Sequence, residues 1–254
     1  MHKILALWAH PRSMSTATER VMRERGDLAC LHEPFMYDYY VGHGRDFPGF
    51  EPAKDHPTDY AGIRAMLRQA AEKGPVFFKD MAFYVVPRML DDPVFMAEIT
   101  HTFLVRSPMA SILSYHKLDP DFGLEEVGIE AQWRLYDAAR NAGLSPVVIE
   151  AESVRADPKG TMRAYWNAVG LDYREAAFDW QAPPKDWEHV SAWHEEASTS
   201  SGIRTADAEE MLRKEMEFEA LVERAPHLQA YLDHHAPFYA KLSEAALWPG
   251  EEGR

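Results

Sequence analysis

The chain has 254 residues and a formal net charge of −14 at pH 7, which argues against binding a long nucleic acid through counterion release. Cys30 is its single cysteine, so no internal disulfide can form, and this suits a reducing compartment. No apolar run approaches the ~20 residues of a membrane-spanning helix, and the start of the chain lacks the apolar core of a secretory signal, so we expect a cytoplasmic protein without membrane contact.

The first predicted elements are an apolar strand over residues 4–9, a polar turn, and a helix that begins near residue 17. N–H groups in the first turn of a helix have no intrahelical partner, and the helix dipole adds positive charge there. Arg12 adds a cation, and the turn supplies the hydroxyls of Ser13, Ser15 and Thr16. This pattern predicts a phosphate or sulfate site, with simple helix capping by Ser15 or Thr16 as the alternative. The turn lacks the glycines and lysine of a Walker A loop, so a nucleoside triphosphate is not the first expectation.

A second strand is predicted over residues 28–32, and Glu33 follows it directly. Open α/β sheets bind ligands at the carboxyl ends of their strands, so Glu33 is a candidate general base. The alternative is a glutamate that pairs with Arg12 or caps a loop. Residues 35–60 are rich in aromatic residues, Gly, Pro and His without a clean period. We interpret them as a lid over the acceptor, with an ordinary surface loop as the alternative.

A helix over residues 60–72 leads to a third strand over residues 76–78, with Lys79 expected at the carboxyl end of that strand. There its ammonium group can neutralise charge on a transferred group, although lysines at strand ends are commonly just solvated. Residues 85–96 are predicted to form a helix and a turn broken by Pro87 and Pro93.

A second strand-to-helix junction repeats the design of the first. A short strand ends at Arg106, Ser107 has the N-cap position, and Pro108 has the favoured first helical position. Ser114 lies eight residues after Arg106, inside the helix. Two junctions that each carry an arginine and hydroxyls can bind two separate phosphates of one ligand.

The later elements complete an alternation of strands and helices. Helices are predicted over residues 124–142 and 158–168 on either side of a strand over residues 146–149, which implies a parallel sheet with helices on both faces. Beyond residue 171 the pattern becomes irregular, and we expect Trp180, Trp187 and Trp193 to seal the core or flank a pocket. A charged helix over residues 206–224 and a helix pair over residues 226–246 follow. The sequence contains no metal-binding motif.

Together the two junctions resemble the signatures of sulfotransferases that use 3′-phosphoadenosine 5′-phosphosulfate. The segment from Pro11 to Thr16 is similar to the 5′-phosphosulfate loop of that family, and Arg106 with Ser114 resembles its 3′-phosphate site. Two further segments match in the family's order, and they read Glu33-Pro34-Phe35 and Phe78-Lys79-Asp80-Met81. The resemblance implies a three-layer, P-loop-like α/β fold with a central, mostly parallel five-stranded sheet. It also implies one domain over residues 1–254, with a core over about residues 3–170 and a helical extension over about residues 171–254.

The resemblance further implies roles for individual residues. The donor is 3′-phosphoadenosine 5′-phosphosulfate as co-substrate, without a metal, and the acceptor is a small molecule with a hydroxyl or amine. The expected donor ligands are Arg12, Ser13, Met14, Ser15, Thr16, Arg106 and Ser114, with Ser201 and Arg204 from a late loop. The expected catalytic residues are Glu33, Lys79 and Arg12, and a homodimer is left open. Glu33 is preferred as the base because Met81 replaces the histidine of the K-x-H motif in one branch of the family, and Asp80 and His116 are the runners-up.

Two alternatives stay open at this point. Met14 and Met81 stand where the family has Gly and His, so a degenerate member that binds nucleotide without turnover is one alternative. A P-loop phosphotransferase is the other, and it needs magnesium ligands and a Walker-type lysine, neither of which is apparent. The main interpretation predicts that Arg12, Glu33, Lys79 and Arg106 open onto one cleft at the carboxyl edge of the sheet.

Overall fold

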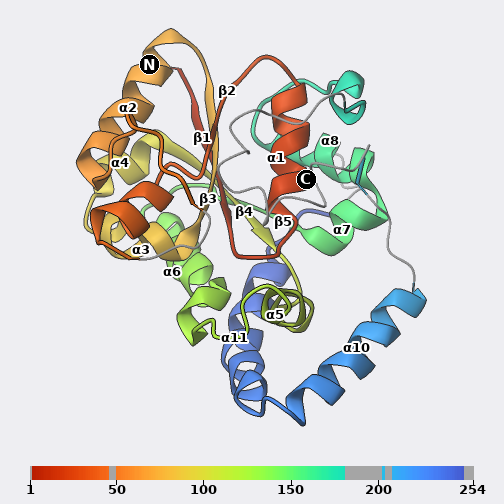
Figure 1. The fold of residues 1–254 in the computed structure, drawn as a ribbon. Helices are drawn as coiled ribbons and strands as arrows, with labels where there is room; N and C mark the ends of the chain where they lie inside the picture. Colours follow the sequence, from red (N-terminus) through yellow and green to blue (C-terminus); the bar gives the residue numbers. More distant parts are fainter. Residues whose placement is uncertain (1, 46–49, 181–201, 204–207, 249–254) are drawn as a thin grey trace.

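A computed structural model describes residues 2–45, 50–180, 202–203 and 208–248 of the chain (Figure 1). Its centre is a five-stranded sheet in the order β2-β3-β1-β4-β5, and every pair of neighbouring strands is parallel. The strands are β1 (Ile4–Ala9), β2 (Ala29–His32), β3 (Val76–Met81), β4 (Ile99–Val105) and β5 (Val147–Glu150). The prediction of an α/β fold with a parallel five-stranded sheet is confirmed.

Strands β2 and β3 lie on one side of the central strand β1, and β4 and β5 lie on the other, so the strand order reverses at β1. It pairs with β3 on one side and β4 on the other, and all six of its residues are buried. A continuous apolar run is what a parallel strand needs when helices cover both of its faces. Ligands of open α/β folds bind beyond the carboxyl end of a strand at such a switch point. The turn after β1, which contains Arg12, occupies this position.

Helices cover both faces of the sheet (Figure 1). On one face α1 (Ser15–Glu24), α7 (Ala151–Ala156) and α8 (Pro158–Ala168) bury a core with Leu7, Phe77 and Trp166. The opposite face carries α2 (Tyr60–Lys73), α3 (Ala82–Leu90), α4 (Pro93–Glu98), α6 (Ile129–Asn141) and α11 (His227–Glu244). Side chains alternate between the faces along a strand, so Phe77 and Lys79 of β3 are directed to the α1 layer, and Phe78 and Asp80 to the other.

The remaining elements gather beyond the carboxyl edge of the sheet or on its flanks. Helix α5 (Pro108–His116) follows β4, and α10 (Ala208–Val222) and α11 pack against it. Three short helices are η1 (Tyr37–Gly42), η2 (Leu124–Val127) and η3 (Glu175–Phe178). In Figure 1, α10 extends away from the sheet at the end of the molecule that carries α5.

The structure corrects several predicted elements. The segment expected to be irregular contains the π-helix η1, whose buried Asp38 accepts a hydrogen bond from the backbone N of Tyr60 at 3.2 Å. Strand β3 continues to Met81, so Lys79 lies inside it and not at its end. A lysine is tolerated there because carboxylates pair with it, as described below. Helix α7 was not predicted.

Glycine and proline explain the other differences. Gly128 has a φ of 80° and separates η2 from α6, where one long helix was predicted. Pro87 lies within α3 and does not end it; burial of Val86 and Met89 offsets the one backbone hydrogen bond that a proline removes. The predicted final helix pair is the single helix α11, which contains Pro237. Trp180 is buried, whereas Trp187 and Trp193 lie outside the described residues.

Candidate active site

The turn after β1 has an unusual backbone. Arg12 has a φ of 61° and Met14 a φ of 69°, and Glu33, at 40°, is the other non-glycine residue with positive φ in the described part of the chain. Side chains disfavour this left-handed region, and such strain tends to occur at functional sites. All three residues belong to the site predicted from the sequence. Met14 takes the conformation that glycine adopts most readily.

The hydroxyls of this turn do not cap α1. The N-cap residue is Met14, which makes no side-chain cap bond, so the capping alternative for Ser15 and Thr16 is not what the structure shows. The Ser13 Oγ is buried and has no hydrogen-bond partner among the described residues. A buried hydroxyl without a partner is energetically costly unless a ligand or water satisfies it. Ser13 therefore fits the predicted anion site.

The second junction lies against the first. Ser107 is the N-cap of α5 and Pro108 lies in its first turn, as predicted. The Arg106 Nη1 donates to the backbone O of Arg12 at 2.6 Å, and the Arg12 Nε donates to the Ser114 Oγ at 2.9 Å. Residues that the sequence assigned to two phosphate sites thus form one bonded group. Burial lowers the pKa of Arg106 from its usual value, and an arginine still remains a cation at neutral pH.

His10 is a part of this junction that the sequence analysis missed. Its Nε2 accepts a hydrogen bond from the backbone N of Arg106 at 3.1 Å, and its side chain is fully buried. Burial, with the charge of Arg106 as the next cause, lowers the pKa of His10 to about 3. A neutral imidazole therefore holds the backbone of the second junction against the first. Its position directly before Pro11 was the only sequence signal.

A second group of predicted residues forms a buried ion cluster, which we define as Glu19, His32, Glu33 and Lys79. The Lys79 Nζ forms an ion pair with the Glu33 Oε1 and lies 3.8 Å from the Glu19 Oε2. His32 places Nδ1 2.7 Å from the Glu19 Oε2 and Nε2 3.8 Å from the Glu33 Oε1. Glu19 and Lys79 are fully buried and Glu33 is 5% exposed. Sequence reasoning found Glu33 and Lys79, but not Glu19 and His32.

Local structure explains how this cluster forms. His32 ends β2 in register with Lys79 of β3, and the backbone N of Glu33 donates to the Lys79 O at 2.8 Å. Glu19 comes from α1, one helical turn after Ser15. Burial alone raises the pKa of Glu19, but His32, Lys79 and Arg23 together outweigh it and hold that pKa below its usual range. Glu19 is therefore an ionised carboxylate.

The runner-up bases are less suited to proton transfer. Asp80 accepts hydrogen bonds from the backbone N atoms of Phe35 at 2.6 Å and Met81 at 3.0 Å, so it shapes the turn after Glu33. Burial and the nearby Glu33 raise the pKa of Asp80. His116 ends α5 two residues after Ser114, a spacing that directs two helical side chains away from each other.

Two tyrosines lie within electrostatic range of Glu33, and one of them belongs to the segment predicted as a lid. The rings of Tyr40 and Tyr84 are 5.5 Å apart, and a hydrogen bond joins their hydroxyls. Burial, followed by the charge of Glu33, raises the pKa of Tyr84. Tyr40 comes from η1, inside the segment interpreted as a lid, and Tyr84 comes from α3. The aromatic composition of residues 35–60 was the only signal for it.

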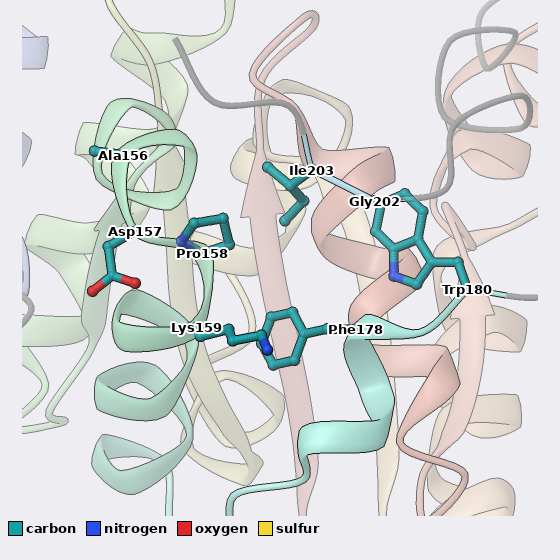
Figure 2. A pocket seen from close by; sticks show the side chains of 8 residues that line it. All are labelled: Ala156, Asp157, Pro158, Lys159, Phe178, Trp180, Gly202 and Ile203. Atoms are coloured by element: carbon teal, nitrogen blue, oxygen red, sulfur yellow. The ribbon is translucent and has the colours of Figure 1, made fainter. Parts of the chain in front are cut away.

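An open pocket of about 330 Å³ lies at the start of α8, and Figure 2 shows its lining. Trp180 lies across the pocket from the α8 residues, and the ring of Phe178 lies beside Lys159 (Figure 2). The Trp180 Nε1 is buried without a hydrogen-bond partner in the described part of the chain. The rings of Phe178 and Trp180 give the pocket an aromatic lining, which suits a planar ligand. Its lining residues are Ala156, Asp157, Pro158, Lys159, Phe178, Trp180, Gly202 and Ile203.

The predicted site residues thus fall into two groups at one edge of the sheet. Arg12, Glu33 and Arg106 follow the carboxyl ends of the parallel strands β1, β2 and β4, and Lys79 lies near that of β3. A single cleft shared by all four side chains stays a prediction. Ser201 and Arg204 lie outside the described residues, although Gly202 and Ile203 between them line the pocket.

The described residues contain neither a membrane-spanning helix nor a metal site. No helix there has the length and apolar character required to cross a membrane. No group of three or more His, Cys, Asp or Glu side chains there is placed to hold a metal ion.

Comparison with protein families matches residues 2–234 of the chain to the sulfotransferase domain. Among curated proteins, it is similar to the branched-chain-amino-acid aminotransferase-like proteins 2 and 1 of Arabidopsis thaliana, with 24% identity over 206 residues and 23% over 208. These matches cover 79% of this chain and 36% of each relative, so the chain spans about a third of the length of these relatives.

Two solved structures are similar to this one. The sulfotransferase domain from the curacin biosynthetic pathway has a TM-score of 0.47 and 13% identity, and the match covers 72% of this chain and 79% of that domain. The sulfotransferase domain from the Synechococcus PCC 7002 olefin synthase has a TM-score of 0.45 and 15% identity, with 87% and 94% covered.

Proposed function

This chain belongs to the sulfotransferase domain family, and from that premise we propose that it transfers a sulfuryl group from 3′-phosphoadenosine 5′-phosphosulfate to a hydroxyl or amine of a small acceptor. The observation that carries the proposal is the bonded group of Arg12, Arg106 and Ser114, at the same edge of the sheet as a buried carboxylate paired with a lysine. It combines two helix N-termini and two arginines, as a ligand with two separate phosphates requires.

The donor chemistry fits the residues of the two junctions. In this proposal the turn from Arg12 to Thr16 and the first turn of α1 hold the 5′-phosphosulfate, and Arg106 with the N-terminus of α5 holds the 3′-phosphate. The unpaired Ser13 Oγ supports the first assignment. The pocket in Figure 2 suits the planar base, because Phe178 and Trp180 line it with two aromatic rings. The late residues Ser201 and Arg204 stay predicted donor ligands.

In the proposed reaction Glu33 removes the proton of the acceptor while the acceptor oxygen or nitrogen forms a bond to sulfur. The bond from sulfur to the bridging oxygen breaks, and its electron pair passes to the leaving phosphate. Arg12, Lys79 and the N–H groups of the turn stabilise that charge. The ion pair with Lys79 holds the Glu33 carboxylate in place at the end of β2. The Tyr40 and Tyr84 group lies where an acceptor ring can pack beside Glu33.

The left-handed backbone of Met14 bears on the binding-only alternative. Met14 adopts the left-handed conformation that glycine favours, so the turn has a backbone geometry that a glycine could also take. Met81 is buried at the end of β3, and Glu33 supplies a carboxylate that can act in place of a histidine. These observations favour an active enzyme over a degenerate one.

Incubation with a ³⁵S-labelled donor and a panel of phenols, alcohols and amines tests the proposal. We expect labelled product together with 3′,5′-bisphosphate nucleotide for at least one acceptor, and no transfer from Mg-ATP under the same conditions. Binding of the nucleotide without transfer to any acceptor would overturn the proposal in favour of the binding-only alternative. Phosphoryl transfer from ATP would favour the phosphotransferase.

A further inference from the structure

The buried ion cluster contains more than a base and its lysine. Its four side chains form a closed ring of alternating partners, in which Lys79 and His32 each lie between the same two carboxylates, Glu19 and Glu33. The reaction proposed above uses only Glu33 and Lys79. Glu19 and His32 are buried titratable groups that it leaves without a role.

The partners of His32 determine its tautomer. The Glu19 Oε2 lies 2.7 Å from Nδ1, and an ionised carboxylate can only accept a hydrogen bond. Nδ1 therefore carries the proton. In the neutral imidazole the lone pair is then on Nε2, the atom that faces the Glu33 Oε1 at 3.8 Å. The ring nitrogen that can take a proton is the one directed at the candidate base.

Burial and a second hydrogen bond fix the position of Glu19 beside His32. Its second oxygen, Oε1, accepts from the Arg23 Nε at 2.7 Å, and its side chain is fully buried. Because α1 begins in the phosphate-binding turn, this carboxylate ties the base to the helix that receives the donor. A purely structural role would need only the pairing of Glu19 with Lys79 and Arg23. It does not account for an imidazole placed between Glu19 and Glu33.

We propose that His32 receives the acceptor proton from Glu33, and that Glu19 is a positioning residue that fixes the tautomer His32 needs. This inference rests on the proposed sulfuryl transfer. After transfer, the protonated Glu33 side chain closes the 3.8 Å between its Oε1 and the His32 Nε2 to hydrogen-bond distance and passes the proton on, so Glu33 returns to a carboxylate and His32 becomes an imidazolium between two carboxylates. His32 then releases that proton to solvent, which its side chain reaches with 6% exposure. One proton leaves the acceptor and one reaches solvent, with no other reactant.

A pH readout must take into account every charged or titratable group around this path. Those on the path are Glu19, His32 and Glu33. Those packed against it are Arg23 of α1, Lys79 and Asp80 of β3, Tyr40 of η1 and Tyr84 of α3. Lys79 is paired with both carboxylates, so a change at His32 leaves a cation between Glu19 and Glu33.

The first test is NMR of ¹⁵N-histidine-labelled protein, which reads the tautomer without any need for activity. We expect His32, assigned through its backbone resonances, to carry its proton on Nδ1 in the neutral form. Glu19→Gln should mix the two tautomers, because an amide can donate as well as accept. A neutral His32 with its proton on Nε2 in the parent protein would overturn the proposal.

The second test compares His32→Gln with the parent in sulfuryl transfer across pH 5 to 9. We expect kcat to fall at least about tenfold, less than the 10²–10⁴ for loss of the base itself, with KM for donor and acceptor within about twofold. The pH profile of kcat should differ between the parent and His32→Gln, because only the parent has the imidazole on the proposed proton path. Cys30→Ser, on the same face of β2, is the matched control and should keep the parent profile.

The outcomes separate this inference from the proposed function. A His32→Gln enzyme with the parent kcat and pH profile overturns the proton relay and leaves sulfuryl transfer intact. A parent protein that binds the bisphosphate nucleotide but transfers no sulfuryl group overturns both. If His32→Gln does not fold, Glu19→Gln gives the same kinetic comparison, since it disturbs the tautomer and leaves the imidazole in place.

Discussion

The Arg12 Nε donates a 2.9 Å hydrogen bond to the Ser114 Oγ, although the two residues are 102 positions apart in the chain. One residue follows the central strand β1 and the other lies in the helix after β4, so this bond joins the two strand-to-helix junctions directly. A ligand that reaches one junction therefore meets the other. This relationship supports the assignment of both junctions to one donor with two phosphate groups.

Arg106→Ala should weaken binding of a 3′,5′-bisphosphate nucleotide by roughly 2 kcal/mol, about 30-fold, because a charge-assisted contact to one phosphate is lost. It should change binding of the 5′-monophosphate much less. Isothermal titration with both nucleotides measures the difference, and Arg64→Ala, on α2, is the control. Equal losses of affinity for the two nucleotides would show that Arg106 does not bind the 3′-phosphate.

Lys79→Met should lower the free energy of unfolding by about 3 kcal/mol, because it leaves Glu33 and Glu19 buried without their shared cation. Adding Glu33→Gln should recover part of that loss. Urea unfolding of the single and double variants measures both effects. Lys159→Met is the matched control: it breaks an ion pair whose side chains are 55% and 63% exposed and should have little effect. Additive losses in the double variant would show that the pair is not coupled.

The sequence predicted those features of the fold that depend on a few neighbouring residues. The strand, turn and helix order around Arg12 and Arg106 was predicted because each junction carries its own Ser, Pro and Arg pattern within a few residues. Gly170 follows α8 and has a left-handed φ of 67°, the conformation in which glycine commonly ends a helix. These features depend on neighbours in the chain, which a sequence displays.

The parts that were missed depend on tertiary contacts. In the sequence, nothing distinguishes Glu19 from the other charged residues of its helix. Only the packing of α1 on β2 and β3 brings it to His32 and Lys79. Lys79 was placed at the end of its strand because a charge inside a buried strand is unfavourable without partners, and the partners come from elsewhere in the chain. The π-helix η1 was missed because its residues have no regular apolar period.

Met14 should tolerate glycine better than valine. With a φ of 69°, Met14 occupies a region that costs an L-residue roughly 1–2 kcal/mol and that a β-branched residue adopts least readily. We expect Met14→Gly to keep the melting temperature and nucleotide affinity near those of the parent, and Met14→Val to lower both. Thermal shift with and without bisphosphate nucleotide measures them. A valine variant as stable as the glycine variant would contradict the strained backbone.

Stability should decrease as the pH falls below about 6.5, the ordinary pKa of a histidine. Burial lowers the pKa of His101 to about 4 and that of His235 to about 4, so the folded protein resists protonation that the unfolded chain accepts. The free energy of unfolding is therefore lost as the pH decreases from about 6.5 toward 4. Melting temperatures across this range measure it. His101→Gln should flatten the dependence, and the exposed His227→Gln should not; a parent melting temperature that is constant from pH 7 to 5 would contradict the account.

The most direct test of the central claim is the Glu33→Gln variant, since the account places the general base of sulfuryl transfer at Glu33. Glutamine keeps the shape of the side chain but cannot take up the acceptor proton. Nucleotide affinity and turnover are to be measured on the same preparation, with Asp80→Asn as the comparison. The account predicts a bisphosphate affinity within about twofold of the parent and a turnover reduced about 10²–10⁴-fold. A Glu33→Gln enzyme that keeps most of its turnover would contradict the account and place the base elsewhere.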